Sequence, residues 1–186
     1  MNQENLRNAK AVDTYILCGN GTETWHPSFT YHGFRYIQVE GFPYRPLPGD
    51  ITVQVVRSSM DQTGEFNCSN KLLNDIHKMI VNTEASNLHS VPTDCPQRDE
   101  RMGWLNDLTV RIEQAIYNFN MSRFYPKFID DVEDTQNPDG SITCVAPFRF
   151  GMRQADPVVA SYLLLAWKFY EFSVVARCSL VLYAGV

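Results

Sequence analysis

The hydrophobic pattern changes its period near residue 66, and this change constrains the fold more than any other feature. Residues 11–57 alternate apolar and polar positions and are rich in aromatic and β-branched side chains, which is typical of β-strands. After Phe66 the apolar residues recur every three to four positions, as on one face of an α-helix. Three or four strands cannot bury both faces of a sheet, so residues 11–57 are predicted to be the end of a larger β-domain.

Three helical segments are predicted after the change. The first has Ser69 or Asn70 as its N-cap. Its buried face is expected to consist of Leu72, Leu73, Ile76, Met79, Ile80 and Thr83. The second has Asp107 as its N-cap. Its expected buried side chains are Leu108, Ile112, Ala115, Ile116 and Phe119.

Helical character is predicted to continue from Arg123 to Val132, followed by a turn with Asp139 and Gly140 at its tip. The third helical face is expected to contain Val159, Tyr162, Leu163, Ala166, Phe169 and Tyr170. The apolar stretch 157–186 is interrupted by Lys168, Glu171 and Arg177, which leaves pieces shorter than the roughly 20 residues of a membrane span. A buried helix is therefore predicted there, and no membrane partner.

Charge and residue composition exclude several classes of function. The net charge of −5 is spread evenly over 186 residues without a Lys/Arg run, which argues against a nucleic-acid partner. The five cysteines form no CxxC pair and the four histidines stand apart, so no metal site, disulfide framework or cofactor is predicted. The first residues, MNQENLRNAKAVD, lack the apolar core of a signal peptide; this favours the cytoplasm but leaves the compartment open.

Polar function concentrates in the loop 93–107, between the first two predicted helices. Its members with functional side chains are Thr93, Asp94, Gln97, Arg98, Asp99, Glu100, Arg101, Trp104 and Asp107. Carboxylates and guanidiniums bind hydroxyl groups, and an indole covers the apolar face of a pyranose, so these residue types suit a sugar site. Glycoside cleavage also needs a protonated acid, and the neighbouring aspartates are expected to favour a proton on Glu100. The alternative is a solvated charged loop that caps a helix, with Arg98 and Arg101 pairing the acids.

The string VPTDCPQRDERMGWLND, residues 91–107, resembles the signature of family 78 glycoside hydrolases, the bacterial and fungal α-L-rhamnosidases. That signature usually has the form TDCPQRDER, a hydrophobic residue, then GW-x-GD. The upstream string WHPSFTYHGFRYIQVEG is similar to the segment that closes the family's β-domain. The downstream string YNFNMSRFYPKFIDDVEDTQNPDGSITCVAP is similar to its next helical hairpin. The resemblance covers roughly residues 10–172.

The resemblance implies both a fold and an activity. Residues 1–65 would be the C-terminal part of a β-sandwich domain, and residues 66–186 the first hairpins of an incomplete (α/α)6 toroid. The implied reaction is hydrolysis of terminal non-reducing α-L-rhamnose with inversion at the anomeric carbon. The implied partners are rhamnose-containing glycosides or oligosaccharides.

The resemblance also implies a role for five side chains of the loop. Glu100 matches the general acid that protonates the glycosidic oxygen. Asp94, Arg98 and Asp107 match positions that hold rhamnose hydroxyls, and Trp104 matches the wall of the sugar pocket. The family's general base is a glutamate of a much later hairpin, which is not among these residues, so the chain alone is expected to be inactive.

The sequence departs from the family pattern at three places. Asn106 replaces the usual glycine before the aspartate. No Trp-Gly-Asp-Ala pattern occurs in residues 153–172, which leaves Asp156 as the only candidate sugar contact between 150 and 160. The segment 173–186 lacks the polar turn expected between hairpins, which indicates a truncated or frameshifted product, or divergence. Two alternatives stay open: a catalytically inactive carbohydrate-binding fragment, or a six-hairpin hydrolase of another sugar.

Overall fold

The structure is a computed structural model that describes residues 2–149 and 160–173. The chain divides into two compact units. The first unit comprises Met1–Val56 together with Pro96–Arg101, and the second comprises Arg57–Cys95 together with Met102–Val186. The predicted positions Val159 and Asp156, and the segment 174–186, lie outside the described residues.

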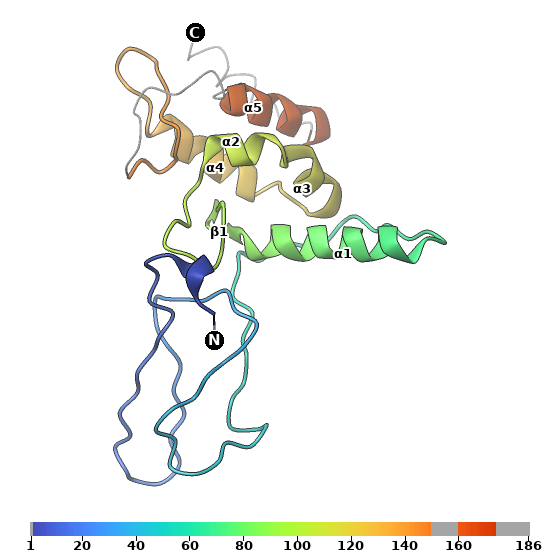
Figure 1. Cartoon of the computed structure of the whole chain (residues 1–186). Coiled ribbons are helices and arrows are strands. Elements are labelled where there is room, and N and C mark those ends of the chain that lie inside the picture. The colour runs from blue at the N-terminus through green and yellow to red at the C-terminus, as the bar shows by residue number, and fades with distance from the viewer. Residues whose placement is uncertain (1, 150–159, 174–186) are drawn as a thin grey trace. The chain divides into compact units, whose positions relative to one another are not determined.

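The first unit has one short regular element, the 3₁₀-helix η1 (Glu4–Leu6). No strand is present among its described residues, which run as extended chain and bends from the blue to the cyan part of the ribbon (Figure 1). The predicted order of β followed by α is therefore not confirmed. A strand persists only where its backbone N–H and C=O groups pair with a neighbour. These described residues form no such ladder, and large side chains such as Ile16 and Tyr36 are 83% and 76% exposed.

The second unit is helical, as predicted. Its elements are α1 (Lys71–Ser86), β1 (Leu88–His89), β2 (Val91–Pro92), α2 (Leu105–Thr109), α3 (Ile112–Asn118), α4 (Phe124–Glu133) and α5 (Ala160–Ser173). The two strands form an antiparallel hairpin, with Leu88 opposite Pro92, that turns at Ser90 with a φ of 64°.

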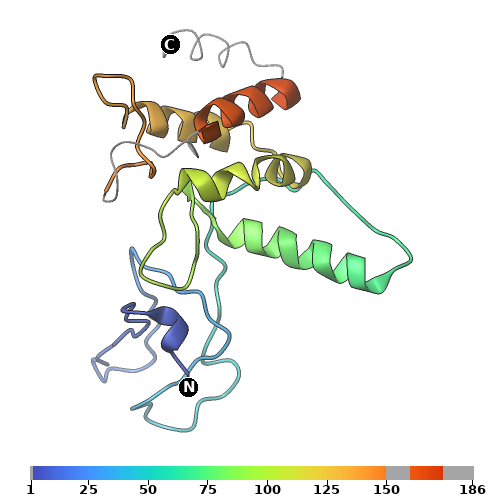
Figure 2. The ribbon, with the colours of Figure 1, turned by 45° about the horizontal axis from the view of Figure 1, so that its top comes forward.

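The core of the second unit lies where α5 packs against α2, α3 and α4, and both views show α5 beside these helices (Figures 1 and 2). Tyr125 of α4 is fully buried and meets Phe169 of α5 edge-on, with 6.5 Å between ring centroids. The Tyr125 hydroxyl donates to the carbonyl of Ile112 at 3.3 Å. Burying one side chain of this size stabilises the fold by roughly 1.5–3 kcal/mol.

The N-terminus of α1 is where the sequence predicts it. Asn70 is the N-cap, and its side chain accepts from the backbone N–H of Leu72 at 2.9 Å. The predicted buried face of α1 is wrong, however: Leu72 and Met79 are 66% and 60% exposed. The helix packs against α3 and β1, and the side chains buried by α1 are instead Val81 and Glu84.

The second predicted helix is two short helices, α2 and α3, separated near Val110. Four of its five expected core residues are buried, namely Leu108, Ile112, Ala115 and Phe119. The N-cap prediction is wrong, because α2 begins after Trp104 and Asp107 lies in its first turn.

The segment from Arg123 to Val132 forms α4 within one residue of its predicted ends, and the turn at Gly140 has a φ of 83°. On α5 the predicted face is confirmed in part: Ala166 and Phe169 are buried, whereas Leu163 is 52% exposed. Within residues 2–149 and 160–173, every helix is too short or too polar to cross a bilayer.

Candidate functional site

The polar loop starts at a tightly held residue, Thr93, which is 3% exposed. Its backbone N–H donates to the carbonyl of Asn87 at 2.8 Å, and its hydroxyl donates to the same carbonyl at 3.1 Å. Asn87 is itself the residue that ends α1. The start of the loop is therefore fixed to the C-terminus of α1.

Asp94 and Met102 close the loop at its base. The N–H of Asp94 donates to the Met102 carbonyl at 3.1 Å, and the N–H of Met102 donates to Oδ1 of Asp94 at 2.9 Å. The N–H of Trp104 donates to the same Met102 carbonyl at 3.0 Å. The backbone N–H groups of two predicted site residues, Asp94 and Trp104, thus donate to the same carbonyl, that of Met102. Both side chains are half-buried.

The residues after Met102 lie against a second loop. The N–H of Leu105 donates to the carbonyl of Cys144 at 3.0 Å, and the N–H of Ala146 donates to the carbonyl of Gly103 at 3.0 Å. A Cβ atom at Gly103 would lie 2.2 Å from the Ala146 carbonyl oxygen and 2.9 Å from the Phe128 ring. Only glycine permits this approach, which sequence reasoning did not anticipate.

Asp107 is exposed on the first turn of α2. The prediction that it caps this helix fails because the helix begins three residues earlier, where the N–H of Leu105 is bound by the Cys144 carbonyl. A carboxylate in a first turn is still favoured by the positive end of the helix dipole. Asp107 therefore lies at the exposed start of α2, three residues after the N-cap Trp104.

The tip of the loop, Pro96–Arg101, belongs to the first unit and carries Glu100. Oε2 of Glu100 lies 2.8 Å from Nη2 of Arg98 and 3.0 Å from Nη1 of Arg7. The Glu100 side chain is 20% exposed. Within this unit the cationic groups that contact the Glu100 carboxylate are the guanidiniums of Arg98 and Arg7. The Arg98 contact is the one expected of a charged loop that pairs its own acids.

Arg101 fastens the tip to the first unit. Its Nη1 donates to the carbonyl of Tyr31 at 2.8 Å, its Nε donates to the carbonyl of Arg98 at 3.0 Å, and its guanidinium lies 4.6 Å from the Tyr31 ring centroid. Such stacking of a cation on an aromatic ring adds to the hydrogen bonds. Arg101 therefore supports the turn that carries Glu100, and it does not pair an acid as the sequence suggested.

A shallow hollow of about 250 Å³ adjoins this tip in the first unit. Its lining residues are Ala9, Lys10, Ala11, Thr30, His32, Arg98, Asp99 and Arg101. His32 is held by Asp13, with 2.9 Å between Nε2 and Oδ2. One predicted site residue, Arg98, thus lines a concave surface.

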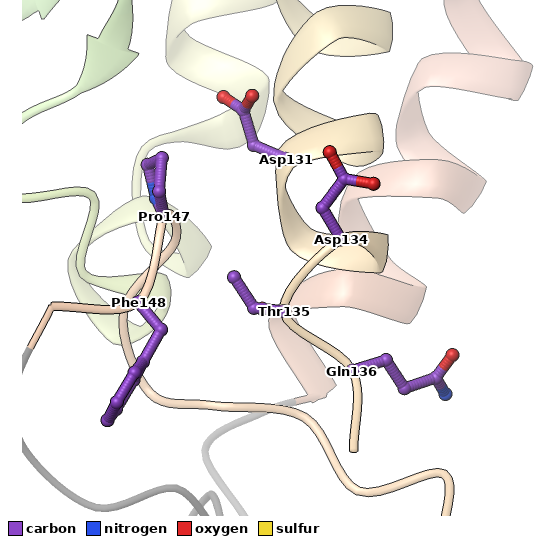
Figure 3. Close-up of a pocket in the computed structure, with 6 residues that line it drawn as sticks. All are labelled: Asp131, Asp134, Thr135, Gln136, Pro147 and Phe148. Carbon is purple, nitrogen blue, oxygen red and sulfur yellow. The ribbon is translucent and has the colours of Figure 1, made fainter. Parts of the chain in front are cut away.

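A second hollow, of about 350 Å³, lies in the second unit at the end of α4 (Figure 3). Its lining residues are Asp131, Asp134, Thr135, Gln136, Pro147 and Phe148. In the close-up, Asp131 stands on α4, Asp134 is the residue that follows its end, and the phenyl ring of Phe148 comes from the facing loop. No residue of the predicted site lines this hollow, and the sequence offered no signal for it beyond the acidic end of α4.

A buried ion pair lies behind the base of the loop. Oε2 of Glu84 on α1 lies 3.8 Å from Nη1 of Arg111, the residue before α3, and Glu84 is 3% exposed. Nη2 of Arg111 donates to the carbonyl of Thr93 at 2.9 Å. Burial raises the pKa of the Glu84 carboxyl, and the charge of Arg111 lowers it in part. Sequence reasoning missed this pair.

Two family models match the chain in succession. Residues 1–57 match the concanavalin-like domain of bacterial α-L-rhamnosidases, and residues 61–174 match their six-hairpin glycosidase domain. Among curated relatives, an α-L-rhamnosidase of Streptomyces avermitilis is 46% identical over 143 residues, which are 77% of this chain and 14% of the relative. One of Formosa agariphila is 40% identical over 124 residues, which are 67% of this chain and 13% of the relative.

Solved structures show the same similarity. The α-L-rhamnosidase of Streptomyces avermitilis complexed with L-rhamnose superposes with a TM-score of 0.82 at 39% identity, covering 89% of this chain and 16% of that one. The enzyme of Dictyoglumus thermophilum gives a TM-score of 0.77 at 46% identity, covering 78% of this chain and 17% of that one. The chain thus spans about a sixth of the length of these proteins. Because the six-hairpin match alone covers more than half of the residues, the chain belongs to the bacterial α-L-rhamnosidase family.

Proposed function

We propose that the protein containing this chain, called the intact enzyme below, hydrolyses terminal α-L-rhamnose from rhamnosides. The observation that carries the proposal is the similarity to the Streptomyces avermitilis enzyme, which was solved with L-rhamnose and covers 89% of the chain. The loop 91–107, with its carboxylates, guanidiniums and indole, supports the proposal independently because these groups suit a sugar ligand.

Glu100 is assigned as the general acid, with Arg98 beside it as a ligand of sugar hydroxyls. The 2.8 Å contact between Arg98 and Glu100 supports this assignment, since a hydroxyl held by the guanidinium would lie next to the carboxyl. Asp94, Asp107 and Trp104 are assigned to the rest of the sugar pocket. Asp94 and Trp104 share the Met102 carbonyl as a backbone anchor, which supports their acting together.

Glu100 contacts Arg98 and Arg7, and both contacts bear on its role as proton donor. As general acid, the Glu100 carboxyl must face the glycosidic oxygen and donate a proton to it as the bond breaks. In this proposal the sugar hydroxyls bind the guanidinium of Arg98 and leave the carboxyl of Glu100 facing the glycosidic oxygen. Arg7, whose side chain is 54% exposed, gives up its contact at little cost because exposed ion pairs contribute little.

The reaction is proposed to invert the anomeric carbon. Inversion needs a second carboxylate roughly 6.5–9.5 Å from the acid, with a water molecule between them. That base is proposed to lie outside the present residues, in a later hairpin. In the same proposal, residues 1–65 are the end of a β-sandwich domain and residues 66–186 the start of the toroid.

The test is hydrolysis of 4-nitrophenyl α-L-rhamnoside by the intact enzyme, with the matched α-L-arabinoside, β-D-glucoside and α-D-mannoside as controls. Turnover of the rhamnoside, with β-L-rhamnose as the first product in proton NMR, is expected. Preference for another glycoside would support the alternative of a six-hairpin hydrolase of a different sugar. Binding of L-rhamnose without turnover of any glycoside would support a carbohydrate-binding protein and would contradict the proposal.

A further inference from the structure

Glu84 and Arg111 form an ion pair in the interior of the second unit. Glu84 is 3% exposed and the Arg111 side chain is 15% exposed, so the carboxyl is buried and the guanidinium is largely withdrawn from water. Their 3.8 Å separation makes an ion pair but no hydrogen bond. A buried ion pair often stabilises a protein no better than apolar side chains of the same volume. Its presence therefore calls for a role other than stability.

Arg111 has a second contact, and it reaches the predicted sugar site. Its Nη2 donates to the carbonyl oxygen of Thr93 at 2.9 Å. That oxygen belongs to the peptide group whose N–H is that of Asp94, and this N–H donates to the Met102 carbonyl at 3.1 Å. One peptide group is thus held at both ends, by Arg111 on its oxygen and by Met102 on its nitrogen.

The orientation of this peptide group determines where the Asp94 side chain points. Thr93 itself is anchored to Asn87 through its backbone N–H and its hydroxyl, so the chain before the peptide group cannot move freely. Without the guanidinium, the Thr93 carbonyl loses a charge-assisted donor and the peptide can rotate about its flanking bonds. Glu84 contacts the other terminal nitrogen of the guanidinium and so holds Arg111 in the position from which it binds the Thr93 carbonyl.

We propose that Arg111, held by Glu84, is a positioning residue for Asp94 in the rhamnose site; this rests on the proposed function. Arg111 touches no substrate. It acts through the Thr93–Asp94 peptide, which places the carboxylate where sugar hydroxyls bind. Precise placement of a binding group is needed for its contribution to affinity.

The kinetic test compares variants of the intact enzyme on 4-nitrophenyl α-L-rhamnoside. Arg111→Met is expected to raise KM roughly tenfold while kcat changes by less than about threefold, because ground-state binding is what is lost. Arg111→Lys retains the charge and a donor and should recover part of the KM. Lys168→Met is the matched control, since it removes an ion pair with Glu113 in the same unit away from the loop, and should leave KM unchanged.

Stability and positioning are separated by the double variant Glu84→Gln/Arg111→Met. It leaves no unpaired buried charge, so its thermal unfolding should return toward that of the wild type, whereas its KM should stay raised. Recovery of both stability and KM would show that Arg111 acts only through folding and would overturn the proposal. An unchanged KM in Arg111→Met would also overturn it.

Hydrogen exchange tests the positioning role of Arg111 independently of rhamnoside turnover. In Arg111→Met the backbone N–H groups of Asp94 and Met102 are expected to lose at least tenfold in protection, while α3 retains its own. Equal protection in variant and wild type would contradict the positioning role. If the wild type hydrolyses no rhamnoside but these amides lose protection, the proposed function fails and the positioning of Asp94 by Arg111 stands.

Discussion

Asp94 and Met102 are joined by two hydrogen bonds, one between backbone groups and one that uses the Asp94 carboxylate. The N–H of Met102 donates to Oδ1 of Asp94 at 2.9 Å, and the N–H of Asp94 donates to the Met102 carbonyl at 3.1 Å. The carboxylate assigned to the sugar therefore also closes the base of its own loop. The Asp94 side chain therefore has two roles, sugar binding and closure of the loop, which substitutions can separate.

Asp94→Asn and Asp94→Ala are expected to differ in stability but not in activity. Asparagine keeps a side-chain oxygen for the Met102 N–H, so its unfolding free energy should stay within about 0.5 kcal/mol of wild type. Alanine leaves that donor without its acceptor and should cost about 1–3 kcal/mol. Both variants should lose rhamnoside turnover in the intact enzyme. Equal unfolding free energies for the two variants, measured in urea, would argue against the closing role of the carboxylate.

Gly103→Ala is expected to destabilise the second unit. The new Cβ would lie 2.2 Å from the Ala146 carbonyl oxygen. This clash with a backbone atom is relieved only if the segment 144–146 moves. Overpacking of this kind costs about 1–3 kcal/mol. Gly49→Ala is the control, because nothing lies within 4 Å of a Cβ there. A midpoint of thermal unfolding that is unchanged in Gly103→Ala would mean that this close approach is absent in solution.

The buried Glu84 carboxyl predicts a pH dependence of stability. Burial raises its pKa above the ordinary value of 4.5, so the folded state holds this proton more tightly than the unfolded chain. This contribution to stability is fully present below pH 4.5 and is lost as the pH rises through the folded-state pKa. The unfolding free energy of wild type minus that of Glu84→Gln should therefore fall as the pH rises above 4.5. A difference that increases over this range would show that the charge of Arg111 outweighs burial.

The helices of the second unit were predictable where their signals are local. Asn70 is a cap residue directly before an apolar period, and the core face around Ile112 follows the 3.6-residue repeat. The apolar face of α1 was misjudged because periodicity shows that a face is apolar but not whether a partner covers it. The strands predicted in residues 11–57 are not confirmed, since a strand needs a partner that its own sequence does not supply.

The candidate site was predictable in its composition but not in its contacts. The motif placed Asp94 and Glu100 in one loop, where Met102 and Arg98 are among their partners. The second arginine that contacts Glu100, Arg7, lies far away in the sequence. Arg111 gave no signal because it lies in a helical stretch, 27 positions from Glu84 (111 − 84). Long-range pairing of charges is set by packing, which a single sequence does not reveal.

The 186-residue chain, expressed alone, is expected not to turn over rhamnosides. Asp94, Asp99 and Asp107 lie close to Glu100 in sequence, so a carboxylate on the opposite face of the sugar must come from another hairpin. The exposed apolar side chains of α1 and α5 should also make the isolated chain prone to aggregation. The measurement is an assay with 4-nitrophenyl α-L-rhamnoside after circular dichroism has confirmed folding. Turnover that Glu100→Gln abolishes would place the base among these aspartates.

The most direct test of Glu100 as general acid compares leaving groups in the intact enzyme. Glu100→Gln keeps the shape of the side chain but removes the transferable proton. For an alkyl rhamnoside, whose leaving group needs protonation, kcat should fall roughly 10²–10⁴-fold. For an aryl rhamnoside with an acidic phenol, the loss should be much smaller, because little protonation is needed. Equal losses of kcat for both substrates would contradict the assignment of Glu100 as the proton donor.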